Sequence, residues 1–253
     1  MNQGAWNRFK KARDRFHRET EELDRLLPEL KNIQQKLADN RSTGKNSSYT
    51  VETPVVYNTA LDDVSINDEI KLILVADNPG RREQALENRR YLVGPSGKIA
   101  AKFFKDNPAL GIDFVKNVII LNKTPIHTPR TNELREICRI EAQMGGNSVA
   151  LALNESQKKM AAILLEFHEA LGTPVYIIGY SEMKTGGIFE AYTEKLKDLY
   201  ADKDQMYKQI YFYRHFSMNQ FTIDLKKQTL PGESVSKTLA RIGAAYRKRI
   251  LGK

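Results

Sequence analysis

The feature that most constrains this chain is a run of apolar residues that ends in a polar turn. Residues Ile70–Ala76 read Ile-Lys-Leu-Ile-Leu-Val-Ala, which has the length and composition of a buried strand. Asp77-Asn78-Pro79-Gly80 follows directly, and its proline and glycine are typical of a turn. Because α/β folds place their chemistry at the carboxyl ends of parallel strands, the sequence predicts that Asp77 and Asn78 lie at a functional sheet edge.

Other segments of the chain alternate between strand and helix patterns. Further strands are expected at Tyr49–Tyr57, Phe114–Leu121, Val175–Tyr180 and Gln209–Arg214. Helices are expected at Gly97–Asp106, from Asn154 to about Leu171, at Gly187–Tyr200 and at Gly232–Leu251. This alternation predicts an α/β fold with three layers, α/β/α, around a mostly parallel central sheet.

The first part of the chain has a different character. Residues from Gly4 to about Ala38 read as a long amphipathic helix, which Pro28 kinks or splits into two. Asp39–Ser48 is polar and is expected to be a linker. The sequence therefore divides into residues 1–48, a basic helix and linker, and an α/β domain at 49–253. The helix is expected to pack on the core, to mediate self-association, or to lie along nucleic acid.

Composition narrows the class of protein. The net charge of +9 suits a polyanionic partner, because phosphate neutralisation releases counterions. No apolar run approaches the ~18 residues of a membrane span, and no secretory signal is visible, so we expect no membrane partner and a cytoplasmic location. Cys138 is the only cysteine, which excludes a disulfide and a cysteine-ligated cluster or zinc site within one chain.

The turn after Ala76 resembles the first motif of the uracil-DNA glycosylase superfamily. Asn78-Pro79-Gly80 matches the Gly-x-Asn-Pro-Gly of the mismatch-specific branch. Asp77, Glu83 and Val93-Gly94-x-x-Gly97 are similar to the Gly-Glu-Ala-Pro-Gly-x-x-Glu and Pro-Phe-Val-Gly-x-x-Gly of the iron–sulfur branch. The chain looks like a hybrid of the two patterns, without the cysteines that hold the cluster.

Two later segments match the same superfamily in the same order. Asn122 follows an apolar strand, where the superfamily has the asparagine whose amide reads the base. His215-Phe216-Ser217 resembles the last motif, His-Pro-Ser, with phenylalanine in place of proline. Met218 or Asn219 falls in the region of the side chain that wedges into the base stack. The resemblance covers roughly residues 70–225.

This resemblance implies a DNA glycosylase that flips out and excises uracil or a related deaminated base, without a metal or other cofactor. Asp77 is then expected to stabilise the sugar cation and help to activate water, Asn78 to position that water, and His215 to donate to the base oxygen O2. The stacking phenylalanine of the superfamily aligns with Leu92, and an aromatic occurs one residue earlier, at Tyr91. Hypoxanthine and xanthine are therefore alternative bases. The residues expected around the base are Gly80, Tyr91, Leu92, Asn122, Ser217 and Met218.

The predicted partner is DNA, single- or double-stranded, that contains a damaged base. Basic residues near the motifs are expected to hold its backbone, and the alternative is a solvated charged surface; they are Arg81, Arg82, Lys98 and Lys123. Two other functions stay open at this point. One is a catalytically weak nucleic-acid-binding protein of the same fold, and the other is a protein that binds a free nucleotide or another small ligand.

Overall fold

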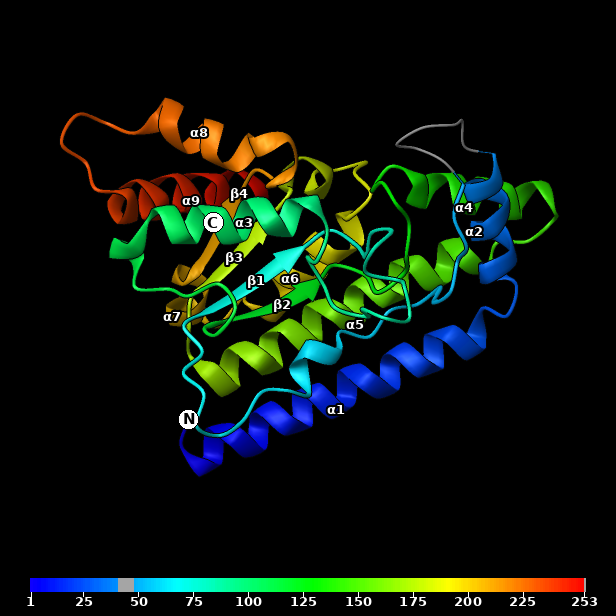
Figure 1. Ribbon diagram of the computed structural model, residues 1–253, viewed down its shortest axis with the longest axis horizontal. Coiled ribbons are helices and arrows are strands. Elements are labelled where there is room, and N and C mark those ends of the chain that lie inside the picture. The colour runs from blue at the N-terminus through cyan, green and yellow to red at the C-terminus, as the bar shows by residue number, and fades with distance from the viewer. Residues whose placement is uncertain (41–47, 253) are drawn as a thin grey trace.

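The computed structural model describes residues 1–40 and 48–252 and has a four-stranded sheet at its centre (Figure 1). The strands are β1 (Leu72–Ala76), β2 (Val118–Asn122), β3 (Val175–Ile178) and β4 (Ile210–Tyr213). Their order is β2-β1-β3-β4 and every pair is parallel, which confirms the predicted α/β fold. Since all four strands run the same way, their carboxyl ends meet at one edge.

Helices cover both faces of this sheet. α3 (Pro95–Asp106), α8 (Gln220–Gln228) and α9 (Val235–Leu251) lie on one face, above the sheet in Figure 1. α5 (Ser148–Leu171) and α6 (Glu190–Leu199) lie on the other. Successive residues of β1 alternate between the two resulting cores, because side chains of a strand point to opposite faces. The strands are thus buried on both sides, as their nearly continuous apolar sequences predict.

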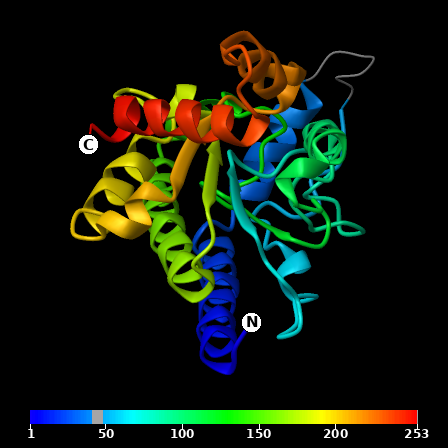
Figure 2. The ribbon, with the colours of Figure 1, turned by 90° about the vertical axis from the view of Figure 1, so that its left-hand side faces the viewer.

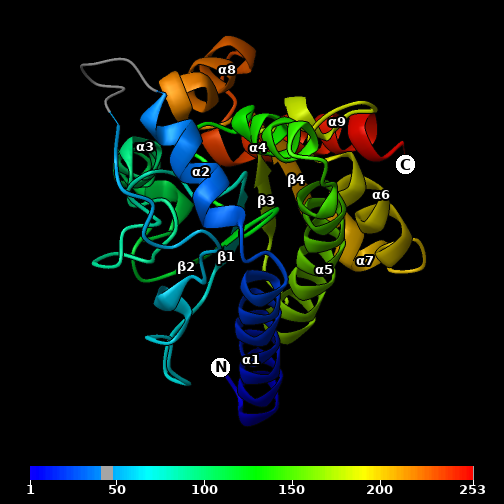
Figure 3. The ribbon, with the colours of Figure 1, turned by 90° about the vertical axis from the view of Figure 1, so that its right-hand side faces the viewer.

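The N-terminal segment is split into two helices at Pro28. α1 spans Gln3–Leu26 and α2 spans Leu30–Asp39, as expected where proline removes a backbone donor. α1 lies alongside α5 in Figures 1 and 3, and its Phe9 and Phe16 are fully buried in the same core as the sheet. The apolar face of α1 is therefore covered within the chain. The predicted division at residue 48 does not separate two cores, and residues 41–47 of the predicted linker lie outside the described residues.

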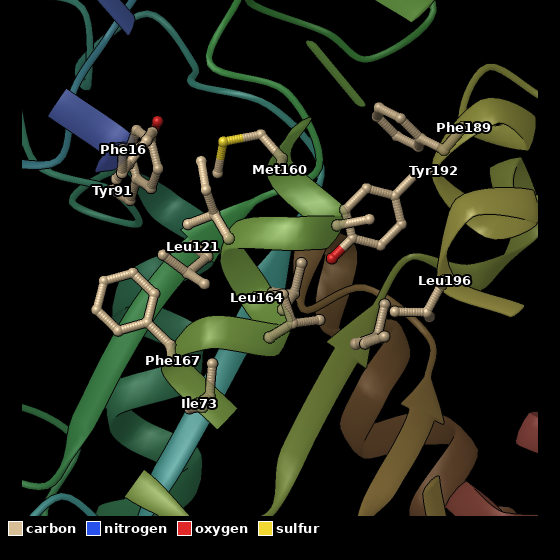
Figure 4. Close-up of a cluster of buried hydrophobic side chains, with 14 of the residues drawn as sticks. Phe16, Ile73, Tyr91, Leu121, Met160, Leu164, Phe167, Phe189, Tyr192 and Leu196 are labelled. Atoms are coloured by element: carbon tan, nitrogen blue, oxygen red, sulfur yellow. The ribbon is translucent and has the colours of Figure 1, made fainter. Parts of the chain in front are cut away.

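The larger core is built from aromatic and branched side chains of several elements. Figure 4 shows Phe167 of α5 on the same side as Tyr91 and Phe16, and Leu164 of α5 between this group and the α6 residue Leu196. Full burial of each such side chain stabilises the fold by about 1.5–3 kcal/mol.

The C-terminal helix α9 packs directly on β4, as Figure 2 shows. Gly243 makes this close approach possible, because a Cβ atom there would lie 2.6 Å from Cβ of Tyr211. This basic helix therefore packs on the sheet. A short helix, α7 (Asp204–Lys208), precedes β4.

One of the predicted strands is wrong. Tyr49–Tyr57 forms no strand beyond a single bridge between Val55 and Ile126, because side chains take its backbone donors. Gln35 accepts from the amide of Val51, and Gln84 accepts from the next two amides.

Helix α5 begins at Ser148 rather than at Asn154. The carboxylate of Glu141 accepts from the hydroxyl of Ser148 and from the amide of Val149, which caps the earlier start. Glu141 belongs to α4 (Glu133–Gln143), a helix in a segment that the sequence pattern did not assign. Among the described helices, none combines the length and the apolar character needed to cross a membrane.

Candidate functional site

A cleft of about 1180 Å³ opens at the carboxyl edge of the sheet. The segments that follow β1, β3 and β4 line it, together with the start of α3 and the loop at 128–132. Most of the predicted site residues lie in its wall: Asp77, Asn78, Gly80, Arg81, Arg82, Leu92, His215, Ser217 and Met218. Motifs far apart in the sequence therefore converge on one hollow.

Asp77 is held by two side chains and by a close approach of the backbone. Its Oδ1 accepts from Nζ of Lys123 at 2.6 Å, and its Oδ2 accepts from the hydroxyl of Thr131 at 3.1 Å. A Cβ atom on Gly179, at the tip of β3, would lie 2.4 Å from Oδ1, and φ at this position is +81°. Only glycine fits both conditions. The carboxylate is therefore fixed in the cleft wall with its side chain 13% exposed.

Lys123 lies behind Asp77 and is completely buried. Its Nζ also donates to the carbonyl of Ile178 at 2.6 Å and lies 4.9 Å from the ring centroid of Phe189. Burial lowers the pKa of this lysine, and the charge of Asp77 opposes the change. The expectation that Lys123 contacts a DNA backbone is wrong, because no part of its side chain reaches the surface.

His215 follows β4 and is half-buried in the cleft wall. Its Nδ1 accepts from the amide of Ser217 at 3.0 Å, which assigns the proton of the neutral ring to Nε2. Burial lowers the pKa of His215, Asp77 raises it, and Lys123 lowers it further. Phe216, which replaces the proline of the His-Pro-Ser motif, is buried and stacks on Phe221 with ring centroids 4.2 Å apart. The ring of Phe216 thus anchors this loop to the core.

Asn78 is oriented by the loop that follows β2. Its Nδ2 donates to the carbonyl of Thr128 at 3.0 Å and to the hydroxyl of the same residue at 2.9 Å. These bonds occupy the amide nitrogen and direct Oδ1 of Asn78 away from Thr128. An amide oxygen in this position is an acceptor for water or for a substrate hydroxyl.

Asn122 ends β2 and pairs in register with Ala76, the residue before Asp77. Its side chain is 1% exposed and is not part of the cleft wall. Within the part of the chain that the structure describes, its Nδ2 has no hydrogen-bond partner. A buried unpaired donor costs about 1–3 kcal/mol, so this nitrogen is an atom that a ligand or a water molecule would satisfy.

The structure separates the two residues predicted to stack on the base. Leu92 lines the cleft, with φ at +54°. Tyr91 points the other way, into the core beside Phe16, and its hydroxyl donates to the carbonyl of Val56 at 2.6 Å (Figure 4). Tyr91 is therefore a core residue here, and Lys98, which is exposed on α3, lies outside the cleft as well.

Sequence reasoning did not assign three features of the site. They are the Asp77–Lys123 ion pair, the hydrogen bond from Thr131 to Asp77, and the burial and raised pKa of Glu83. Glu83 is buried and accepts from the amide of Gly80 at 2.6 Å. Burial raises its pKa to about 7. A lysine that directly follows a buried strand was the available signal for the ion pair, since a lysine buried at such a position needs a charged partner.

Among residues 1–40 and 48–252, no group of three or more His, Cys, Asp or Glu side chains is placed to hold a metal ion. Comparisons of the chain with family models, with curated proteins and with solved structures find no match. The geometry of the cleft and the three motifs therefore carry the functional argument.

Proposed function

We propose that this protein is a DNA glycosylase that hydrolyses the N-glycosidic bond of uracil or a related deaminated base. The observation that carries the proposal is the meeting of Asp77 and Asn78, from the tip of β1, with His215, from the tip of β4, in one cleft. A fixed carboxylate, an amide oxygen and a neutral imidazole are the groups that this reaction requires.

The reaction develops opposite charges on its two halves. The C1′–N bond breaks and its electron pair leaves with the base, while the sugar gains the character of a cation. Asp77 stabilises the cation, and Nε2–H of His215 donates to the oxygen of the base as negative charge grows there. A neutral histidine is suited to this role because it donates one hydrogen bond without needing a raised pKa.

Water completes the reaction by adding to C1′ and losing a proton, and the free base gains a proton. Oδ1 of Asn78 is the acceptor that we assign to this water, because the other end of the same amide is anchored on Thr128. Asn122 is buried outside the cleft wall, so we assign it no contact with the base in this cleft.

The rim of the cleft has the features of a nucleic-acid surface. Arg81 and Arg82 line it, and the net charge of the chain is +9. Met218 stands at the rim with 79% of its surface exposed, on a turn where both Met218 and Asn219 have positive φ. An exposed apolar side chain beside basic residues suits a wedge that occupies the space of a flipped nucleotide, a step that costs a few kcal/mol.

The proposal is tested by incubating the purified chain with end-labelled oligonucleotides that carry uracil, hypoxanthine or xanthine. Each is offered in single and double strands, and alkali then converts any abasic site into a strand break. We expect breaks at one or more of these bases and a loss of at least two decades in rate for Asp77→Ala.

The matched control is Asp113→Ala, which removes a carboxylate at the opposite edge of the sheet, just before β2. This variant should excise at the rate of the unchanged chain. Survival of all three bases in the presence of excess protein would refute the activity, and DNA binding without any strand break would identify a binding protein instead.

A further inference from the structure

The buried ammonium of Lys123 is unusual enough to need a reason. Transfer of a lysine charge into a protein interior costs several kcal/mol after relaxation, and a salt bridge offsets this only with good geometry. An apolar side chain of similar size would fill the same space without that cost. The chain nevertheless places this charge directly behind the cleft wall, with 0% of its side chain exposed.

Lys123 holds Asp77 through both its main chain and its side chain. Its backbone amide donates to the carbonyls of Ala76 and Asp77, each at 3.0 Å. Its Nζ donates to Oδ1 of Asp77 and to the carbonyl of Ile178, both at 2.6 Å. The ammonium thus joins the tips of β1, β2 and β3, and the position of the Asp77 carboxylate depends on it.

We propose that Lys123 is a positioning residue, which orients the Asp77 carboxylate from behind and keeps the neighbouring His215 imidazole neutral. The proposal rests on the proposed function, since it explains how an anion for the sugar and a neutral donor for the base exist side by side. A carboxylate alone beside a histidine favours the imidazolium. A second, positive charge that stays out of the cleft opposes this bias.

The charges around His215 support this arrangement. Burial has the largest effect on its pKa and lowers it; Asp77 raises the pKa, and Lys123 opposes Asp77 by lowering it. Arg81, Arg82, Glu83 and Arg130 line the same cleft. Thr131 adds a neutral bond to Oδ2 of Asp77, so both oxygens of the carboxylate are engaged and it acts through its charge rather than as a base.

The first test reads the protonation of His215 directly, without any substrate. NMR titration of the histidine rings in the unchanged chain should show His215 below the ordinary value of 6.5. Lys123→Gln removes the charge but keeps a donor, and it should raise the pKa of His215 by at least one unit, a tenfold change in proton affinity. His168, at the amino end of β4, is an internal control whose titration should not change.

Lys123→Met removes the donor as well as the charge, and it should shift His215 in the same direction if it folds. Should neither variant fold, the titration of the unchanged chain still tests whether His215 is neutral. An unchanged chain in which His215 titrates above 6.5 overturns the proposal, and so does a folded Lys123→Gln with an unshifted His215.

The second test uses excision of whichever base the unchanged chain removes. Because a neutral His215 is required, the excision rate should fall as the pH drops below the pKa of His215. In Lys123→Gln the midpoint of this fall should move to higher pH by the same amount as in the NMR titration. KM for the oligonucleotide should not change, since Lys123 does not reach the surface. Lys208→Gln, at the opposite edge of the sheet, is the matched control and should keep the original profile.

The outcomes separate the two proposals. No excision by the unchanged chain refutes the proposed function, while the NMR titration still tests the placement of charge by Lys123. Excision with an identical pH profile in the unchanged chain and in Lys123→Gln refutes the role of Lys123 and leaves the function standing.

Discussion

The amino end of β4 lies beside a buried histidine and its carboxyl end leads into a half-buried one. The two histidines differ in the hydrogen bonds of their ring nitrogens. At the amino end, Nδ1 of His168 bonds the hydroxyl of Tyr200 and Nε2 bonds Oε1 of Gln209, both at 2.9 Å. At the carboxyl end, Nδ1 of His215 accepts from Ser217, and no hydrogen bond to its Nε2 is found from the described residues. Burial lowers the pKa of both rings. The two rings differ in their hydrogen bonds: both nitrogens of His168 are occupied by its own core, and His215 keeps a donor for a ligand.

The largest expected effect comes from removing each ring in turn. His215→Ala should lower the excision rate by about two to three decades, the cost of losing one preorganised donor, and should change stability little. His168→Ala should instead lower the free energy of unfolding by several kcal/mol, because it leaves a cavity and two unpaired polar groups. Excision rates and urea denaturation of both variants measure the contrast. Equal loss of activity in the folded fraction of both would remove the distinction.

A change of pH should alter the stability contributions of Glu83 and His168, which lie at opposite edges of the sheet, in opposite directions. Glu83, at the carboxyl end, has a pKa of about 7 in the fold against 4.5 for an ordinary carboxyl, so the folded state binds its proton more tightly. The stabilisation is present below pH 4.5 and is lost as pH rises to about 7, a change of about 3 kcal/mol. His168 has a lowered pKa, so its contribution is lost as pH falls below 6.5.

Urea denaturation of Glu83→Gln and of His168→Gln over this pH range separates the two contributions. Relative to the unchanged chain, Glu83→Gln should become less destabilised, or more stable, as pH rises from 4.5 to 7. His168→Gln should behave in the opposite way on the acid side. A constant difference from the unchanged chain across the range would contradict the shift for that residue.

Glycines at the two edges provide a smaller test. Gly179→Ala adds a Cβ atom 2.4 Å from Asp77 and strains a backbone at φ +81°, whereas Gly111→Ala strains a backbone at φ +65° with nothing within 4 Å. Both should lose about 1–2 kcal/mol of stability from strain, and only Gly179→Ala should also displace Asp77 and slow excision. Thermal melts and excision rates measure the pair. A Gly179→Ala protein with full activity would show that the position of Asp77 is not critical.

The sequence was sufficient for the parts of this fold that depend on local pattern. The apolar run before Asp77 and the aromatic run before Arg214 are buried strands, and Pro28 divides the N-terminal helix. Tyr49–Tyr57 has the composition of a strand, but the side-chain oxygens of Gln35 and Gln84 accept from its backbone amides. Such contacts between distant residues are absent from a local pattern.

The site was predictable to the same degree. Motifs placed Asp77, Asn78 and His215 at strand ends, and parallel topology then brings them to one edge. The direction of a side chain was not predictable in the same way. Lys123 and Tyr91 belong to the segments that the motifs identified. The side chain of Lys123 nevertheless lies behind Asp77, and that of Tyr91 points into the core, since the burial of each depends on helices that are distant in sequence.

The smallest expected effect concerns DNA binding at the two edges. Arg82 is exposed in the cleft wall and Lys208 is exposed at the amino edge, so each carries one positive charge on opposite sides of the sheet. If the cleft holds the phosphate backbone, Arg82→Ala should reduce the slope of log affinity against log salt by about one, uniformly across sequences. Lys208→Ala should leave the slope unchanged. Fluorescence anisotropy of a labelled single strand between low and moderate salt measures both, and equal slopes for the two variants would mean that binding follows net charge rather than the cleft.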